Sequence, residues 1–297
     1  MIEASAAEGC TAYGSPRIAD TARGRVEYAD FGEGPAVVAL HGAMGGYDQS
    51  AILAHTVLGG RNRIIAISRP GYLGTPLSSG RSPDEQADLV AALLDLLSIE
   101  RAGVIAISGG GPCALAFAHR HPERCSALVL ISTVSGPNPV SIPLRFQIMK
   151  LAARIPPLVS RMRAKALANL EATAARSVRD AVCRQRMLNH PSARRLFVAL
   201  TESLFDRMAK RLVGTDNDIR VTASATFPLE EVAVPTLIVH GTCDERVDFM
   251  THAAAARARI PGARLLRLEG GEHAAIFTHR DQAREGISRF LRDVPPR

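Results

Sequence analysis

The chain has 297 residues, of which 46% are hydrophobic and 22% charged, a composition typical of a folded globular protein rather than a disordered or fibrous one. It has no run of about 18 apolar residues and its first ten residues are acidic, so we expect a cytoplasmic protein without a membrane partner. The net charge of +7 would suit nucleic acid, but there is no Trp and no Tyr in the most basic segment, so base-stacking platforms and a nucleic-acid partner are not predicted.

The first predicted elements are a hairpin and a buried strand. Alternating residues indicate a hairpin from Arg17 to Phe31 with its turn at Arg23-Gly24. The apolar run Ala36–Leu40 is typical of a strand buried on both faces of a parallel sheet. It ends in a glycine-rich loop, residues 41–46, whose backbone N–H groups can face a developing oxyanion. Neither G-x-G-x-x-G nor G-x-x-x-x-G-K-[ST] occurs, so we expect no phosphate cradle and no cofactor.

Helices and strands then alternate. A helix is predicted around residues 50–58, and Arg63–Ser68 is a further apolar strand. Ser82 is an N-cap followed by Pro83 and two acidic residues, which marks the start of a helix. The apolar face of that helix contains Leu89, Ala92, Leu93 and Leu96.

The stretch from Val104 to Pro112 is typical of a strand, a sharp turn and the start of a helix, with Ser108 in the turn. Ala106 and Gly110 flank this serine as the small residues of a G-x-S-x-G nucleophile elbow do, although Ala106 replaces the usual first glycine. A serine that only caps the following helix is the structural alternative.

After the predicted strand Ser126–Ser132, strand patterns disappear between Gly136 and Phe227. Amphipathic helices are predicted over residues 143–155, 159–174, 178–188 and 193–212. This segment has sixteen Lys or Arg residues against six Asp or Glu, whereas the rest of the chain has twenty against twenty-three. The positive charge of the protein therefore belongs to one helical insert.

Strand patterns return in Val234–His240 and Ala263–Leu268, with helices predicted over residues 249–258 and 281–291. A turn containing Asp244 follows the first of these strands, and a loop containing His273 follows the second. The five cysteines are scattered without ligand spacing, so neither disulfides nor a metal site are predicted.

Ser108, Asp244 and His273 supply a hydroxyl, a carboxylate and a base, the three groups that nucleophilic acyl transfer requires. Each follows the carboxyl end of a predicted strand, so a parallel sheet would bring them to one edge. Glu245 and Asp248 are rival acids close in sequence. The predicted oxyanion donors are the N–H of Gly109 and that of either Ala43 or Met44.

From about residue 17 onward the chain resembles the α/β-hydrolase fold proteins. The matching segments are His41-Gly42, Arg69-Pro-Gly-Tyr72, Ser108-Gly-Gly-Gly-Pro112, His240-Gly-Thr-Cys-Asp244 and Gly270-Gly-Glu-His273, in this order. The resemblance implies an α/β fold with a mostly parallel central sheet flanked by helices and an all-helical cap inserted after the sixth strand. The core would comprise residues 1–135 and 228–297, and the cap residues 136–227. It also implies Asp244 as the acid.

The nucleophile restricts the activity that this resemblance implies. Haloalkane dehalogenases and epoxide hydrolases of this fold carry aspartate where Ser108 stands, and the Gly-Gly-Ser-Trp-Gly elbow of proline iminopeptidase relatives is absent. A carboxylesterase acting on small to medium esters through an acyl-enzyme on Ser108 is the leading expectation. A lactonase, a C–C bond hydrolase or a slow ligand receptor of the same fold remain as alternatives.

The basic insert would cover Ser108 and shape the substrate pocket. Its arginines are either solvated residues of an outer face or attract anionic substrates such as monoesters of dicarboxylic acids. The expected partner is a small-molecule ester, and the expected assembly a monomer or homodimer.

Overall fold

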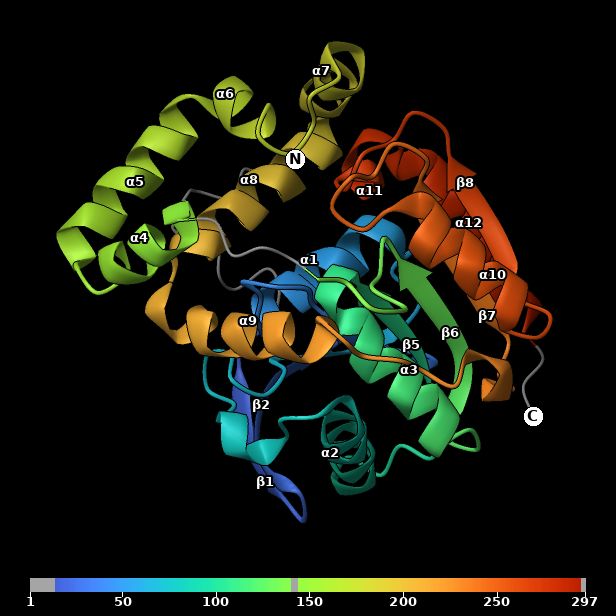
Figure 1. The fold of residues 1–297 in the computed structure, drawn as a ribbon. Coiled ribbons are helices and arrows are strands. Elements are labelled where there is room, and N and C mark those ends of the chain that lie inside the picture. Colours follow the sequence, from blue (N-terminus) through green and yellow to red (C-terminus); the bar gives the residue numbers. More distant parts are fainter. Residues whose placement is uncertain (1–13, 140–143, 295–297) are drawn as a thin grey trace.

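The structure, a computed structural model, describes residues 14–139 and 144–294 and is built on one eight-stranded sheet of order β1-β2-β4-β3-β5-β6-β7-β8 (Figure 1). From β4 to β8 all neighbours are parallel, whereas β1, β2 and β4 pair antiparallel. The predicted mostly parallel α/β sheet is therefore confirmed. The strands are β1 Arg17–Thr21, β2 Gly24–Phe31, β3 Ala36–Leu40, β4 Arg63–Ile67, β5 Ala102–Ile107, β6 Cys125–Ile131, β7 Thr236–Gly241 and β8 Arg264–Leu268.

The register of the sheet places the carboxyl ends of its central strands at one edge. Leu40, the last residue of β3, lies opposite Ile67 of β4 and Ala106 of β5. Strands β5, β6 and β7 are buried along almost their whole length, as expected for apolar runs covered on both faces. The loops that leave these ends therefore meet above the same edge.

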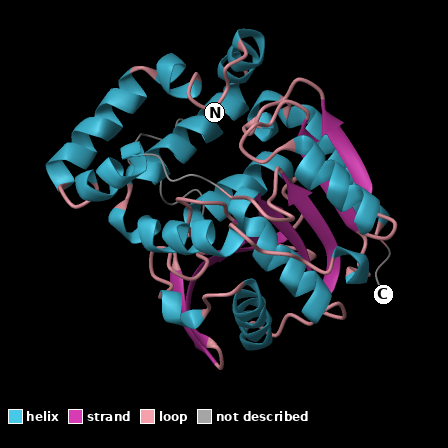
Figure 2. Cartoon of the chain, viewed as in Figure 1, coloured by secondary structure: helices cyan, strands magenta, loops and turns pink. Residues whose placement is uncertain are grey.

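Helices cover both faces of the sheet (Figure 2). Helices α2 and α3 belong to one buried apolar cluster, and α1 and α12 belong to the cluster on the other face. The helices outside the predicted insert are α1 Tyr47–Val57, α2 Pro83–Leu96, α3 Gly111–Arg120, α10 Ala255–Arg259, α11 Ala275–Thr278 and α12 Arg280–Asp293. The Ser82 side chain and Glu85 form a capping box at the start of α2, so the predicted helix start is confirmed.

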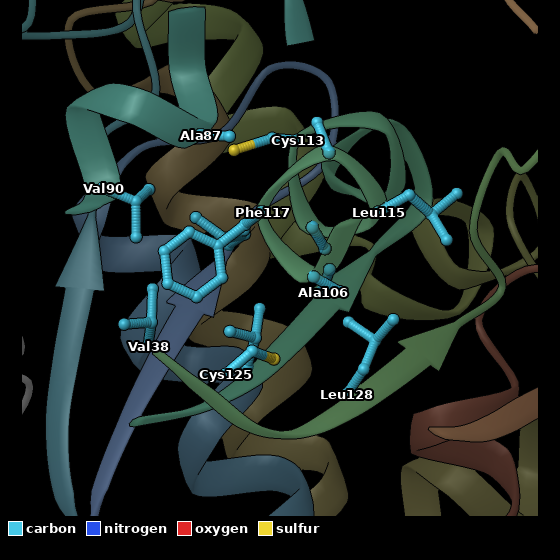
Figure 3. Packing of buried hydrophobic residues seen from close by; sticks show 14 of the residues in the cluster. Val38, Ala87, Val90, Ala106, Cys113, Leu115, Phe117, Cys125 and Leu128 are labelled. Carbon is cyan, nitrogen blue, oxygen red and sulfur yellow. The ribbon is translucent and has the colours of Figure 1, made fainter. Parts of the chain in front are cut away.

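Phe117 of α3 fills the centre of one core layer (Figure 3). Its ring points toward Val38 of β3 and lies near Val90 of α2, and the side chain is fully buried. Ala106, the residue two before the elbow serine, lies in the same cluster. The core therefore holds α3, and with it the turn that precedes α3, against the sheet.

Six α-helices lie between β6 and β7 in the residues that the structure describes: α4 Leu144–Ala152, α5 Pro156–Ala168, α6 Leu170–Ala174, α7 Ala181–Asn189, α8 Pro191–Phe205 and α9 Ala209–Thr222. Residues 140–143, where one of the predicted helices begins, lie outside the described residues. The division into a core and a separate cap domain stays a prediction.

Two helix boundaries predicted in the insert are wrong. The helix predicted over residues 159–174 is broken at Asn169, whose side chain accepts a hydrogen bond from the backbone N–H of Ala172 and caps α6. The helix predicted over 193–212 ends at Phe205, because the chain turns at Arg207 with a φ of 46°. The second half of α9, up to Thr222, has no counterpart among the predicted helices.

We expect Phe117→Ala to lower the free energy of unfolding by about 3–5 kcal/mol, because the fully buried ring would leave a cavity. Leu96, which the sequence pattern wrongly placed on the apolar face of α2, is 55% exposed, so Leu96→Ala is the control and should change this free energy by less than about 0.5 kcal/mol. Urea unfolding followed by circular dichroism measures both. Equal losses in the two variants would contradict this packing.

Candidate active site

Ser108 stands on a sharp turn between β5 and α3. Its φ of 53° is a left-handed conformation that non-glycine residues rarely adopt, and such strain is common at functional sites. The turn packs against the loop after β3: a Cβ atom on Gly42 would lie 2.9 Å from the Ser108 Cβ, and one on Gly110 would lie 2.7 Å from the carbonyl oxygen of His41. Both positions therefore require glycine.

The structure brings Ser108, His273 and Asp244 together from three separate loops. The Nε2 atom of His273 lies 3.1 Å from the Oγ atom of Ser108, and its Nδ1 atom lies 2.8 Å from Oδ2 of Asp244. Because an ionised carboxylate only accepts hydrogen bonds, Nδ1 of His273 carries a proton and Nε2 can accept the serine proton. The arrangement can thus activate the hydroxyl as a nucleophile.

The Asp244 carboxylate is held by four donors. Its Oδ1 accepts the backbone N–H groups of Arg246 and Val247, at 2.9 and 3.1 Å. Its Oδ2 lies 2.8 Å from His273 and 3.4 Å from Nε2 of His240, which also donates to the Val247 carbonyl. Burial alone would raise the pKa of Asp244, but the hydrogen bonds from the two histidines outweigh it and hold that pKa well below its usual value.

The two rival acids lie elsewhere. Glu245 forms an ion pair with Arg179, and the Asp248 side chain accepts the N–H of Thr251 as a helix cap. Neither carboxylate has a hydrogen bond to His273 among the described residues. The geometry therefore selects Asp244 as the partner of His273.

The loop after β3 offers one backbone donor beside Ser108. The N–H of Met44 donates to Oγ1 of Thr215 at 2.9 Å, so it is already engaged. The Ala43 nitrogen lies 3.5 Å from the position that a Cβ atom on Gly109 would take. Within residues 14–139 and 144–294, no acceptor is bonded to the N–H of Ala43. Of the two predicted candidates, the N–H of Met44 is thus engaged and that of Ala43 is not, while a role of Ala43 and Gly109 in an oxyanion hole stays a prediction.

His41 fixes the shape of this loop through both ring nitrogens. Its Nε2 accepts the backbone N–H of Arg69 at 2.9 Å, so the ring proton is on Nδ1, which donates to the Gly42 carbonyl at 2.6 Å. Burial and the neighbouring Arg69 charge lower the pKa of His41 well below its usual value, which keeps the ring neutral. A neutral His41 with this tautomer is required for both hydrogen bonds.

A buried ion pair joins this region to the insert. Both terminal nitrogens of Arg69 donate to the carboxylate of Asp218 on α9, at 3.0 and 2.5 Å, and the Tyr72 hydroxyl donates to the same carboxylate at 2.6 Å. Arg69 also donates through Nε to the His41 carbonyl at 2.9 Å. Because every charge has a partner of opposite sign and satisfied hydrogen bonds, the pair can remain buried.

Thr215 and Asp218 were not among the residues predicted for the site. Both residues lie on α9 and are buried. The Thr215 hydroxyl donates its proton to the Arg211 carbonyl, so the hydroxyl oxygen can accept a hydrogen bond from the N–H of Met44. No motif in the sequence marks them. The only signal is that Asp218 lies in a helix among few other acids of a strongly basic segment.

A second contact ties the insert to the loops that carry Asp244 and His273. Oε1 of Glu272, the residue before His273, accepts the backbone N–H groups of Arg179 and Asp180 at 2.7 and 2.8 Å. The Arg179 side chain in turn reaches Glu272 and Glu245, the residue after Asp244. The turn before α7 is therefore bound to residues adjacent to both members of the His–Asp pair.

Among the described residues, no group of three His, Cys, Asp or Glu side chains is placed to hold a metal ion. Within residues 14–139 and 144–294, no helix has the length and hydropathy to cross a bilayer. Cys113, Cys125 and Cys183 are buried free thiols and Cys243 is exposed, while Cys10 lies outside the described part.

We expect Asp218→Leu to lower the free energy of unfolding by about 3–5 kcal/mol, because it leaves the Arg69 guanidinium buried without a counter-charge. The double variant Arg69→Met/Asp218→Leu should be more stable than Asp218→Leu alone, since it removes both charges. A double-mutant cycle measured by thermal unfolding tests this. Strictly additive losses would show that the two side chains do not interact.

Comparisons with known proteins agree with this architecture. A model of the family described as alpha/beta hydrolase fold matches residues 35–280. The chain is 29% identical over 269 residues to the uncharacterized hydrolase YcgS of Bacillus subtilis, which covers 89% of this chain and 93% of that protein. It is 28% identical over 289 residues to a 2-hydroxy-6-oxononadienedioate/2-hydroxy-6-oxononatrienedioate hydrolase of Burkholderia vietnamiensis, covering 90% and 91% of the two chains.

Among solved structures, an alpha/beta hydrolase fold protein from Nakamurella multipartita is similar over 94% of this chain and 99% of its own, with a TM-score of 0.83 and 34% sequence identity.

Proposed function

Because this chain belongs to the alpha/beta hydrolase fold family, we propose that it is a serine hydrolase that cleaves small to medium carboxylic esters through an acyl-enzyme on Ser108. The observation that carries the proposal is the continuous hydrogen-bonded chain from the Ser108 hydroxyl through His273 to the ionised Asp244. In that arrangement a hydroxyl, its base and the carboxylate that orients the base have the roles of a catalytic triad.

In the first half-reaction His273 accepts the proton of Ser108 as the oxygen attacks the ester carbonyl, and the new C–O bond places negative charge on the carbonyl oxygen. The N–H groups of Ala43 and Gly109 would stabilise that charge. His273 then protonates the leaving alcohol, and an acyl group remains on Ser108. In the second half-reaction His273 activates water, which releases the acid and restores the serine.

The helices α4–α9 act in this proposal as a cap over the site. Part of the charge of this segment is neutralised by acids of the sheet-bearing part, since Arg179, Arg207 and Arg211 pair with Glu272, Glu27 and Asp48. Arg163 and Arg184 pair with acids within the insert, which its net charge already includes. Because most of the excess remains, a monoester of a dicarboxylic acid stays a candidate substrate beside a neutral ester.

Hydrolysis of a C–C bond is the second candidate. The relative from Burkholderia vietnamiensis is named for hydrolysis of a hydroxy-oxo-dienedioate, and it aligns with 90% of this chain. A Ser–His–Asp arrangement with an oxyanion hole suits both reactions, because each passes charge to a carbonyl oxygen. Relative turnover of short-chain aryl esters and of a dienoate ring-cleavage product separates the two.

We expect Ser108→Ala to abolish the turnover of p-nitrophenyl acetate and butyrate and the stoichiometric labelling by a fluorophosphonate probe, because it removes the nucleophile. Ser126→Ala, at the opposite end of the sheet, is the control and should keep both. Labelling without repeated turnover would favour a ligand receptor. Labelling that persists in Ser108→Ala would refute the assignment of this serine.

We expect Thr215→Val to lower kcat about ten- to hundredfold with little change in KM, because the N–H of Met44 loses its acceptor and the neighbouring Ala43 N–H loses its alignment. Thr215→Ser keeps the hydroxyl and should restore most of kcat. Steady-state kinetics on the same ester and binding of a trifluoromethyl ketone, whose hydrate or adduct uses the oxyanion donors, measure the effect. Equal kcat values in the Val and Ser variants would contradict this positioning role.

A further inference from the structure

Helices α4 and α5 lie at the edge of the molecule farthest from β8 (Figure 1), and the segment that joins them carries an exposed apolar stripe. Ile148 and Leu151 lie three residues apart on α4, Ile155 ends the turn that follows α4, and Leu158 lies in the first turn of α5. They are 58%, 63%, 51% and 39% exposed, in the order Ile148, Leu151, Ile155 and Leu158. Four large exposed apolar side chains within this short segment are more than the scattered exposed residues of an ordinary protein surface.

The opposite side of α4 is also apolar and is packed. Phe146 and Met149 contact a cluster formed by Ala153, Met208 and Leu212, and Met44 of the loop after β3 belongs to the same cluster. A helix that is apolar on two sides needs a covering on both. The inner side is covered by the protein, next to the candidate active site, and the outer side faces solvent.

The chain segment that carries the stripe has cations and no acids of its own, and two of its cations, Lys150 and Arg163, pair with acids of α9 and α8. From Gly136 to Leu170 the sequence has six Lys or Arg residues and no Asp or Glu. Arg161 and Lys165 follow Leu158 on the same side of α5 at spacings of three and four, and Arg154 lies beside Ile155. These three side chains are exposed and form no ion pair within the described part of the chain.

We propose that this part of the protein docks on an anionic lipid surface. The docking surface consists of Ile148, Leu151, Ile155 and Leu158 together with Arg154, Arg161 and Lys165. Apolar side chains next to unpaired cations are what an interfacial helix needs, because the former enter the acyl region and the latter bind phosphate groups. A second copy of the chain fits less well, since two such surfaces would bring like charges together. Docking there would place α4 between the lipid and the loop that carries Ala43.

The experiment measures co-sedimentation of the full chain with vesicles of phosphatidylcholine alone or mixed with phosphatidylglycerol. We expect binding to the anionic vesicles that weakens with added salt, and little binding to the neutral ones. The triple variant Arg154→Gln/Arg161→Gln/Lys165→Gln should lose about fivefold in partition coefficient per removed cation. The double variant Leu151→Gln/Ile155→Gln should lose at least about tenfold through its lost apolar contacts.

Val182→Gln/Met250→Gln, which alters two equally exposed apolar residues elsewhere, is the matched control and should bind like the unchanged chain. All variants should keep the Tm and the ester turnover of the unchanged chain. A loss of vesicle binding can therefore be distinguished from a failure of the proposed function. The proposal is overturned if the unchanged chain does not bind anionic vesicles, or if the control variant loses as much binding as Leu151→Gln/Ile155→Gln. It is also overturned if light scattering shows a dimer that Leu151→Gln/Ile155→Gln converts to monomer.

Discussion

The buried ion pair between Arg69 and Asp218 is the interaction on which the geometry around Ser108 depends. Its desolvation cost is large, and the pair is stable only because both guanidinium nitrogens, the Tyr72 hydroxyl and the His41 carbonyl complete its hydrogen bonds. The ion pair also attaches α9, which carries Asp218, to the loop after β4, which carries Arg69. That attachment brings Thr215 to the backbone of Met44, so the shape of the loop after β3 is set partly by a residue about 170 positions later in the chain.

The sheet and the three groups at its edge could be predicted from the sequence because each depends on local patterns. Apolar runs mark the buried strands, and Ser108, Asp244 and His273 each follow such a run directly. The hydrogen bond that engages the N–H of Met44 could not be predicted, because its acceptor is a hydroxyl supplied by α9. That helix contains Gly214 and a run of weak helix formers, and it is held by tertiary contact, with Gly214 packed directly on the Tyr72 ring.

The positive charge of the insert also has a different meaning in the structure than in the sequence. Counted along the chain, the excess of Lys and Arg in the insert suggests an anionic substrate or partner. In space, Arg211 is completely buried and pairs bidentately with Asp48 at 3.0 and 2.6 Å, and Arg207 reaches the buried Glu27. Part of the excess is therefore internal and structural. The exposed cations without an ion pair in the described part of the insert, among them Arg154, Arg161 and Lys165, are the ones available to a partner.

Polar contacts of unequal strength bind the insert to the rest of the protein at α9 and at the turn before α7, while α7 and α8 pack on α1 and α11 through apolar side chains. At α9 the contacts are buried ion pairs, and breaking one by separating its partners costs several kcal/mol. At the turn before α7 the Arg179 side chain is 62% exposed and Glu245 is 71% exposed, so this ion pair contributes at most about 1 kcal/mol. The backbone hydrogen bonds to Glu272 add to it, but water can replace them at an exposed turn. The polar contacts at the turn before α7 are therefore easier to break than those at α9, which keep Thr215 aligned on the loop after β3, whereas Met187 and Phe197 hold α7 and α8 in the apolar cluster shared with α1 and α11.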